Sequence, residues 1–454
     1  MTPVLRSVAL PDLGPLGERP QVPSATFVAR ADAAYAKAGR DWLVVYADRE
    51  HFGNIAFLSG FEPRFEEAFF LLGPRRRCVL ITGNESESYA CIARLPNLEV
   101  LVAQSLSLPG QDRTRYPRLI DRFRDAGLTS GHSVGLVGWK YLEAEEDEES
   151  ARAFFVPAAY VDMIERIIGG AGSLYDATPV LMHPETGLRA MIDADQIAEW
   201  EWTATRCSQA VWRIVSGMRE GETEYEAATR MQYAGDPLNV HMMLPSASPG
   251  EPLVGLRGPT GRRIKRGDGV AVAIGFWGAL SCRAALFDDA NDAFQKKAAG
   301  YFEALCRWYD VADIGIPGGD LCAAMVEALA KSGLRSALNP GHLTGHEEWM
   351  HTPVRPGSTE RIRSGMPFQV DVIPVPMPEG QPLNCEDPVT FADDALRAAI
   401  AARHPDCAAR IEARRRFMRD ELGVDAKPSI LPLSATPLML PPFWLTPDRI
   451  LVRG

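Results

Sequence analysis

The sequence lacks the patterns that mark several protein classes. Its eight cysteines form no Cys-x-x-Cys pair, so neither a zinc motif nor a disulfide framework is predicted, and scattered thiols fit a reducing compartment. No run approaches the roughly 18 apolar residues that a membrane-spanning helix needs. Residues 1–20 contain prolines and acids where a signal peptide has an unbroken apolar core. These absences predict a cytoplasmic protein without a membrane partner.

The sequence also has no excess of positive charge. Lysine and arginine number 48 against 59 aspartates and glutamates, which gives a formal net charge of −11. Because a general nucleic-acid binder shows a basic face, this balance argues against a nucleic-acid partner, although a local arginine pocket can still hold a small anion. The rest of the composition, 46% apolar and 24% charged, is that of an ordinary globular protein with more than one core.

The order of expected elements divides the chain into three parts. Residues 1–180 alternate strand-like apolar runs with helical patterns, which is typical of an α/β domain, and we interpret NIAFLSGF as one of its strands. Residues 188–400 include the longest helical pattern, 193–221, followed by helices that flank antiparallel-looking strands, which indicates an α+β domain. Residues 401–454 form a tail that is first helical and then rich in proline.

Titratable side chains concentrate between Asn339 and Glu386. This stretch holds three of the eight histidines and several carboxylates: His342, His346, His351, Glu347, Glu348, Asp371 and Glu386. Such a cluster among apolar, Gly/Pro-punctuated segments predicts either a metal site or an acid/base site. Asp371 lies inside the apolar run FQVDVIPV, where an unpaired carboxylate is costly, so it needs a partner, with His342 or Arg283 as candidates.

The order of motifs resembles that of a known superfamily. After the long helix come Gly-x-x-Glu-x-Glu at 221–226, Arg-Gly-Asp at 266–268, Gly-His at 341–342, Gly-Met-Pro-Phe-x-Val at 365–370 and Cys-Glu-Asp at 385–387. This order resembles the pita-bread catalytic domain of creatinase, prolidase, aminopeptidase P and methionine aminopeptidase. NIAFLSGFEPRFEEAFFLL resembles the N-terminal domain of the creatinase and prolidase branch. The resemblance implies an α/β N-terminal domain, an α+β pita-bread catalytic domain and a homodimer.

The resemblance also implies which metal ligands are kept. Metal-dependent members hold two ions with two aspartates, one histidine and two glutamates. The histidine position is kept as His342, the first glutamate becomes Asp371, and the second is kept as Glu386.

The two aspartate positions are lost. The first falls on Ala273, and the second falls on Ser281 or Cys282, next to Arg283. Because a two-metal site needs bridging carboxylates to hold ions about 3.5–4 Å apart, we expect no binuclear centre and no required cofactor. A single divalent metal on the three kept residues stays open. Cys282 beside a cation is a candidate nucleophile, which would need a nearby histidine.

Further residues are assigned to the substrate or to catalysis. Arg283 is predicted to hold a substrate carboxylate through two parallel hydrogen bonds. Arg64, by resemblance, is predicted to reach the other subunit's pocket, with a surface ion pair as the alternative. The predicted substrate-binding set is Arg283, His241, Arg64, His346 and Glu348, and the predicted catalytic set is His342, Asp371, Glu386 and His351. For the other histidines the alternatives are a core position or a solvated loop.

The function expected from the sequence is metal-independent, creatinase-like hydrolysis of a C–N bond, amide or amidine, in a small carboxylate-bearing substrate. His342 would move the proton while Asp371 and Glu386 polarise or orient. The creatinase mechanism does not transfer intact, since LVGLRGPTGRRIKRGD lacks the upstream histidine. The alternatives are an Xaa-Pro dipeptidase or aminopeptidase with an atypical single-metal site, a non-catalytic pseudo-peptidase that binds a ligand, and a lyase acting on a small zwitterion.

Overall fold

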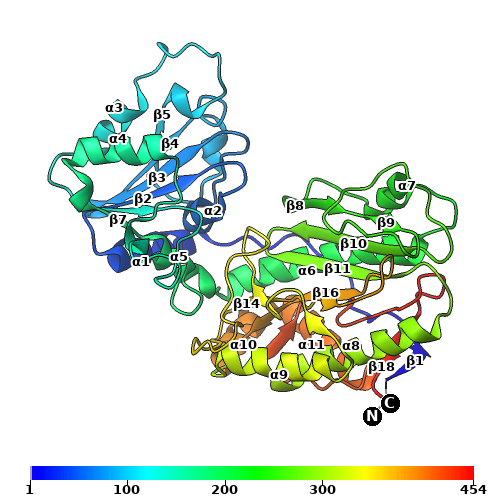
Figure 1. The fold of residues 1–454 in the computed structure, drawn as a ribbon. Coiled ribbons are helices and arrows are strands. Elements are labelled where there is room, and N and C mark those ends of the chain that lie inside the picture. Colours follow the sequence, from blue (N-terminus) through cyan, green and yellow to red (C-terminus); the bar gives the residue numbers. More distant parts are fainter. Residues whose placement is uncertain (1–2) are drawn as a thin grey trace. The chain divides into compact units, whose positions relative to one another are not determined.

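The computed structural model describes residues 3–454, which fall into two compact units (Figure 1). The smaller unit is Val22–Ala190, and the larger unit joins the N-terminal segment up to Gln21 to Met191–Gly454. Residues 401–454, predicted as a separate tail, are therefore part of the larger unit. So is the N-terminal arm, since β1 (Val4–Ser7) pairs antiparallel with β18 (Arg449–Val452). No helix among the described residues is long and apolar enough to cross a membrane.

The smaller unit is an α/β domain, as predicted. Its mixed sheet, within residues 22–190, has the strand order β5 (Glu99–Val102), β4 (Arg77–Thr82), β3 (Ala68–Gly73), β2 (Trp42–Ala47), β6 (Val134–Val137), β7 (Leu174–Asp176). Its α-helices are α1 (Ser24–Ala38), α2 (Gly53–Ser59), α3 (Leu119–Ala126), α4 (Ala158–Ile168) and α5 (Thr178–Met182). Every residue of β2 and β3 is buried, which explains why these central strands are continuous apolar runs.

One predicted strand of this unit is wrong. NIAFLS forms helix α2, which ends where Gly60 adopts a left-handed conformation with φ of 76°. All seven residues of α2 are buried, so the segment shows no alternation of apolar and polar residues. A short helix that is buried on all sides has the same continuous apolar sequence as a buried strand, so the sequence cannot distinguish the two and tertiary packing decides.

The larger unit is built on a curled antiparallel sheet. Among the described residues its strand order is β13 (His342–Leu343), β14 (Pro367–Val370), β16 (Asn384–Phe391), β11 (Ala279–Leu286), β10 (Gly269–Phe276), β8 (Leu238–Met243). Two short strands extend it, β17 (Ile430–Pro432) beside β16 and β9 (Ser246–Ala247) beside β10. A separate ladder pairs β12 (Arg335–Ser336) with β15 (Pro374–Val375). This arrangement confirms the predicted α+β class.

Helices cover this sheet (Figure 1). They are α6 (Ala194–Gly217), α7 (Glu224–Ala228), α8 (Asp292–Val311), α9 (Gly318–Ala330), α10 (Asp394–Arg403) and α11 (Pro405–Asp420). Asp193 is the N-cap of α6, and its side chain accepts a hydrogen bond from the Gln196 amide. The predicted helical tail is two helices, because Pro405 cannot continue α10 and starts α11.

The two faces of the sheet have different surroundings. Alternate residues of a strand point to opposite faces. Cys207 of α6 contacts the carbonyl oxygen of Ile274, and Tyr301 of α8 accepts a hydrogen bond from the Cys385 amide, so these two helices pack on β10 and β16. The opposite face of β10, β11 and β16 carries Ala273, Cys282 and Glu386 and lines a cavity.

Candidate functional site

Three strands place a row of side chains across the floor of the cavity. Ala273 of β10 is the register partner of Cys282 of β11, which in turn pairs with Glu386 of β16. Cys282 rather than Ser281 therefore lies on the cavity face, and Ser281, paired with Ile274, lies on the helix-covered face. The row contains a single carboxylate, at its β16 end.

A glycine turn brings His342 to this row. Gly341 has φ of +115°, a conformation that L side chains rarely adopt, and a Cβ there would meet Trp308 Nε1 at 3.2 Å. Trp308 Nε1 also donates a 3.0 Å hydrogen bond to the Pro340 carbonyl oxygen, which anchors the turn. His342 then pairs with Gln369 of β14, the strand that ends just before Asp371.

The loop after β13 folds back over His342. The Leu343 amide donates to the His351 carbonyl oxygen at 2.7 Å, and the Met350 amide donates to the Leu343 carbonyl oxygen at 3.0 Å. This return places Glu348 Oε1 3.1 Å from His342 Nε2, and it stacks the Trp349 ring on the imidazole with centroids 3.9 Å apart. The negative charge of Glu348 therefore acts directly on the imidazole and raises its pKa.

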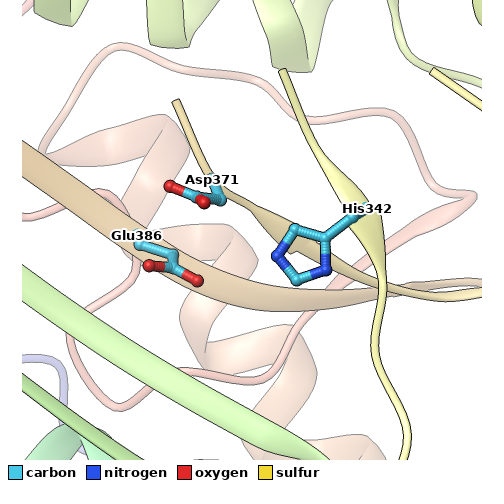
Figure 2. A group of neighbouring side chains, drawn as sticks. All are labelled: His342, Asp371 and Glu386. Atoms are coloured by element: carbon cyan, nitrogen blue, oxygen red, sulfur yellow. The ribbon is translucent and has the colours of Figure 1, made fainter. Parts of the chain in front are cut away.

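His342, Asp371 and Glu386 form one cluster (Figure 2). Each offers a ligand atom, and these atoms all lie within 4.8 Å of one another. The imidazole faces the two carboxylates, which come from the end of β14 and from β16. All three residues are buried. The structure therefore brings together three of the four predicted catalytic residues.

This cluster contains buried polar atoms that the protein does not satisfy. His342 Nε2, Asp371 Oδ1 and Glu386 Oε1 each have no hydrogen-bond partner. The other ring nitrogen, Nδ1, donates to the Leu343 carbonyl oxygen at 3.2 Å, which leaves the lone pair of Nε2 toward the carboxylates in the neutral imidazole. Most buried polar groups in proteins have a partner, so three such atoms at one place indicate a binding site.

Burial and like charge act together on the carboxylates. Burial raises the pKa of Asp371 to about 6, with the nearby charge of Glu348 acting in the same direction and His342 opposing it. Burial, followed by the charges of Asp371 and Glu348, raises the pKa of Glu386 well above its usual value. Burial alone would lower the pKa of His342, but the Glu348 charge and contact outweigh it and raise that pKa. The positive charge that the protein places near these carboxylates is too small to offset their burial and mutual repulsion.

The cluster opens into a cavity of about 490 Å³. Its walls are mostly apolar and include Val240, Met243, Leu256, Leu338, Trp349 and Ile373. A larger hollow of about 700 Å³ runs along α8 and α9, but no member of the cluster lines it. The smaller cavity is the one with chemistry at its floor.

Arg283 does not serve the site as predicted. Its side chain is 1% exposed and points to the helix-covered face, away from Cys282. The guanidinium donates to Asp387, Thr436, Met439 and the carbonyl oxygens of Cys282 and Glu386, so no donor is left for a substrate carboxylate. Neighbouring positions on a strand face opposite ways, and this register removes Arg283 from the cavity.

Three predicted histidines also lie outside the cavity lining. His346 is buried with its ring centroid 5.2 Å from that of Trp277, and His351 Nδ1 accepts a hydrogen bond from the Thr352 amide. His241 is exposed and its Nε2 contacts the Leu256 carbonyl oxygen at 2.8 Å, which ties down the loop that forms one wall. None of the three lines the cavity, and the predicted substrate roles of His346 and His241 and the predicted catalytic role of His351 stay predictions.

The remaining candidates from the sequence are Glu348, Arg64 and Cys282, and they lie in different surroundings. Glu348 lines the cavity beside His342, so its predicted contact with substrate stays a prediction. Arg64, in the smaller unit, forms an ion pair with Glu62 at 2.7 Å, and its predicted action across a dimer stays untested. Cys282 faces the cavity, but burial and then the charge of Glu386 raise the pKa of its thiol, which opposes a nucleophilic role.

Trp349 is a site residue that the sequence patterns did not single out. It stacks on His342, lines the cavity and is 39% exposed. The signal available was an aromatic residue seven positions after His342 in a turn-rich segment. Without the backbone pairing of Leu343 with His351, nothing places it over the imidazole.

Comparison with known proteins gives likeness in structure alone. No family model and no curated protein sequence matches the chain. Among solved structures, a Xaa-Pro dipeptidase from Bacillus anthracis matches with a TM-score of 0.61 and 15% identity over 82% of this chain and 96% of that one. A prolidase from Pyrococcus horikoshii matches with a TM-score of 0.63 and 16% identity over 81% and 95%. The chain has the pita-bread fold.

An X-Pro aminopeptidase from Thermotoga maritima is similar to the same extent, with a TM-score of 0.62 and 17% identity over 81% of this chain and 95% of that chain. These matches span both units and nearly the full length of the known proteins. The resemblance drawn from the motif order is thereby confirmed at the level of the fold.

Proposed function

We propose that this pita-bread protein is a peptidase-like hydrolase that cleaves a C–N bond at the His342–Asp371–Glu386 cluster with one divalent cation. The observation that carries the proposal is the cluster of three buried side chains whose ligand atoms lie within 4.8 Å of one another, and each of which has a nitrogen or oxygen atom without a hydrogen-bond partner. One imidazole nitrogen and two carboxylate oxygens suit a divalent ion with open positions. A cation there would also offset the excess of negative charge that the burial of Asp371 and Glu386 creates.

The same residues do not fit two ions. Ala273 has no ligand atom, and neither it nor Cys282 is a carboxylate that could bridge two ions. The raised pKa of the Cys282 thiol also disfavours the thiolate form that would bind a metal. The names of the similar structures, prolidase and Xaa-Pro peptidases, supply the reaction class to test. Together these points favour the single-metal Xaa-Pro alternative over metal-independent creatinase-like chemistry.

The chain's own residues account for the remaining steps. A bound divalent cation would polarise the scissile carbonyl and lower the pKa of a water molecule. Glu348, which lines the cavity and whose side chain is 25% exposed, is placed to accept a proton from that water. The water oxygen would bond to the carbonyl carbon, the C–N bond would break, and Glu348 would return its proton to the leaving nitrogen. Trp349 keeps the imidazole of His342 in its orientation.

Elemental analysis and an activity assay test this proposal. Protein purified without chelator should hold about one equivalent of Mn, Fe, Co or Zn, and His342→Ala should hold far less. Added Mn²⁺ should raise the melting temperature of the metal-depleted wild type but not that of the variant. Xaa-Pro peptides should be hydrolysed only by the metal-loaded protein. A metal-free protein with full activity would overturn the role of the cation.

One observation favours a second function. The loss of both aspartate positions, to Ala273 and Cys282, is a loss that metal-independent acid/base catalysis would tolerate. In that case turnover persists in chelator and is abolished by Glu386→Gln. The homodimer and the cytoplasmic location remain predictions, which sedimentation analysis and cell fractionation would check.

A further inference from the structure

We infer that the cavity takes a hydrophobic peptide amide, that is, a substrate with apolar side chains and no free carboxylate. This inference rests on the proposed function for the reaction and adds the class of substrate to it. It replaces the small carboxylate-bearing substrate that the sequence alone suggested. Two properties of the cavity carry it, the charge of its lining and the nature of its rim.

The lining contains charge of one sign. Four carboxylates border the cavity, those of Glu348, Asp371, Glu379 and Glu386. No lysine, arginine or histidine is among the described residues that line it. Even with one divalent cation bound, a substrate carboxylate would meet no basic side chain and several acids at short range. Like charges brought together in a partly desolvated site are costly, whereas an N-terminal ammonium is favoured there.

Three basic side chains near the lining are committed elsewhere, as is Arg257 beside Leu256, which donates to Glu224 and Thr260. Arg283 points to the opposite face of the sheet, where its donors are fully used by Asp387 and by backbone carbonyl oxygens. The His241 ring is held by the Leu256 carbonyl oxygen. His342 is fully buried, covered on one face by Trp349 and contacted by Glu348. None of the three can neutralise a substrate carboxylate in the open part of the cavity.

The rim of the cavity is apolar and exposed. Leu256 is 77% exposed, Leu338 is 42% exposed and Trp349 is 39% exposed, and all three line the same cavity. Single exposed apolar side chains are common, but three around one opening mark a surface that a ligand covers. An apolar wall with a few polar groups at its floor is the usual form of a site for a hydrophobic small molecule. The occupant is therefore apolar where it meets the rim and polar only at the scissile amide and the amine.

A matched pair of ligands tests the inference. Leucyl-proline and leucyl-proline amide differ only in the terminal carboxylate. Calorimetric titration of the full-length, chelator-treated protein should show the amide binding at least about tenfold more tightly. The metal-loaded protein should also hydrolyse the amide with the higher kcat/KM.

An engineered cation provides the reverse test. Leu256→Arg replaces one apolar rim contact with a guanidinium, so binding of the amide should weaken while binding of leucyl-proline improves, and the ratio of the two affinities should shift by about tenfold toward leucyl-proline. Val326→Arg is the matched control, because Val326 is 60% exposed on α9 and does not line the cavity. It adds the same charge and should change neither affinity.

The outcomes separate the two proposals. Tighter binding of the amide without hydrolysis under any metal condition supports the substrate class and overturns the proposed function. Hydrolysis with a preference for the free dipeptide supports the function and overturns the substrate class. Equal affinities, or no binding of either ligand at millimolar concentration, also overturn the substrate class, as does a Val326→Arg effect equal to that of Leu256→Arg.

Discussion

Two neighbouring pairs of residues on β11 and β16 face opposite sides of the sheet and differ in how their polar atoms are satisfied. Arg283 and Asp387 point to the helix-covered face, where the guanidinium and carboxylate lie 2.9 Å apart and their remaining atoms are hydrogen-bonded. Cys282 and Glu386, one position earlier on each strand, point to the cavity, and Glu386 Oε1 has no partner. Both acids are buried, and they differ in whether the protein itself satisfies them.

The difference separates a structural charge from a functional one. A buried ion pair with all donors and acceptors used is stable without further ligands, and removal of one member leaves an uncompensated charge. A buried carboxylate with an unsatisfied oxygen beside other acids costs stability in the free protein and gains its partner when a cation or substrate binds. Four experiments would break or sharpen this comparison.

The largest effect on stability is expected from Arg283→Met. The substitution leaves Asp387 buried without its cation, so the free energy of unfolding should fall by about 3–5 kcal/mol in urea titrations. The double variant Arg283→Met, Asp387→Leu removes both charges and should recover much of the loss. If the single variant lost less than about 1 kcal/mol, the buried Arg283–Asp387 ion pair would not have the structural role assigned to it.

Glu386→Gln should have the opposite profile. Because Glu386 is held with a raised pKa among other acids, a neutral amide of the same shape should leave the melting temperature unchanged or higher. Activity toward the peptide amide should fall by at least about 100-fold, together with metal content. A marked drop in melting temperature with activity retained would reverse the assignment of the two neighbouring acids.

Aspartates at positions 273 and 282 test whether the missing carboxylates are what limits the site to one ion. Ala273→Asp with Cys282→Asp should raise the bound metal from one equivalent to two. Without metal the variant should lose roughly 2–4 kcal/mol of stability, because two further charges are buried in an apolar region, and Mn²⁺ should restore it. The control, Ala273→Asn with Cys282→Asn, keeps the volume without the charge and should stay at one equivalent.

The smallest effect concerns Asp176, a half-buried carboxylate of the smaller unit that accepts hydrogen bonds from Thr178. Burial raises its pKa to about 6, against the hydrogen bonds from Thr178. A folded pKa above the unfolded value means that the stabilising proton is lost as the pH rises through about 6. Stability should therefore fall by roughly 1 kcal/mol from pH 5 to 7.5, and Asp176→Asn should lack this part of the pH dependence in paired unfolding titrations.

Much of the fold followed from local patterns. The long helix α6, the strands β10 and β11 after Arg-Gly-Asp, and the α/β character of residues 22–190 were all predictable. Their apolar periodicity and turn residues are properties of short segments. Helix α2 was missed because it is buried on all sides, and the break at Pro405 was missed because the charge pattern continues across it.

The sequence by itself determined which acids and histidine make up the cluster proposed to hold a cation, His342, Asp371 and Glu386, since motif order carries that information. Tertiary structure decided which side chains face the cavity. A shift of one residue along a strand reverses its direction, so Cys282 and Arg283 could not be told apart by proximity in sequence. Likewise, only the return of the loop after β13 brings Glu348 and Trp349 onto His342. Register and loop closure depend on contacts between distant segments, and these set the charge and shape of the site.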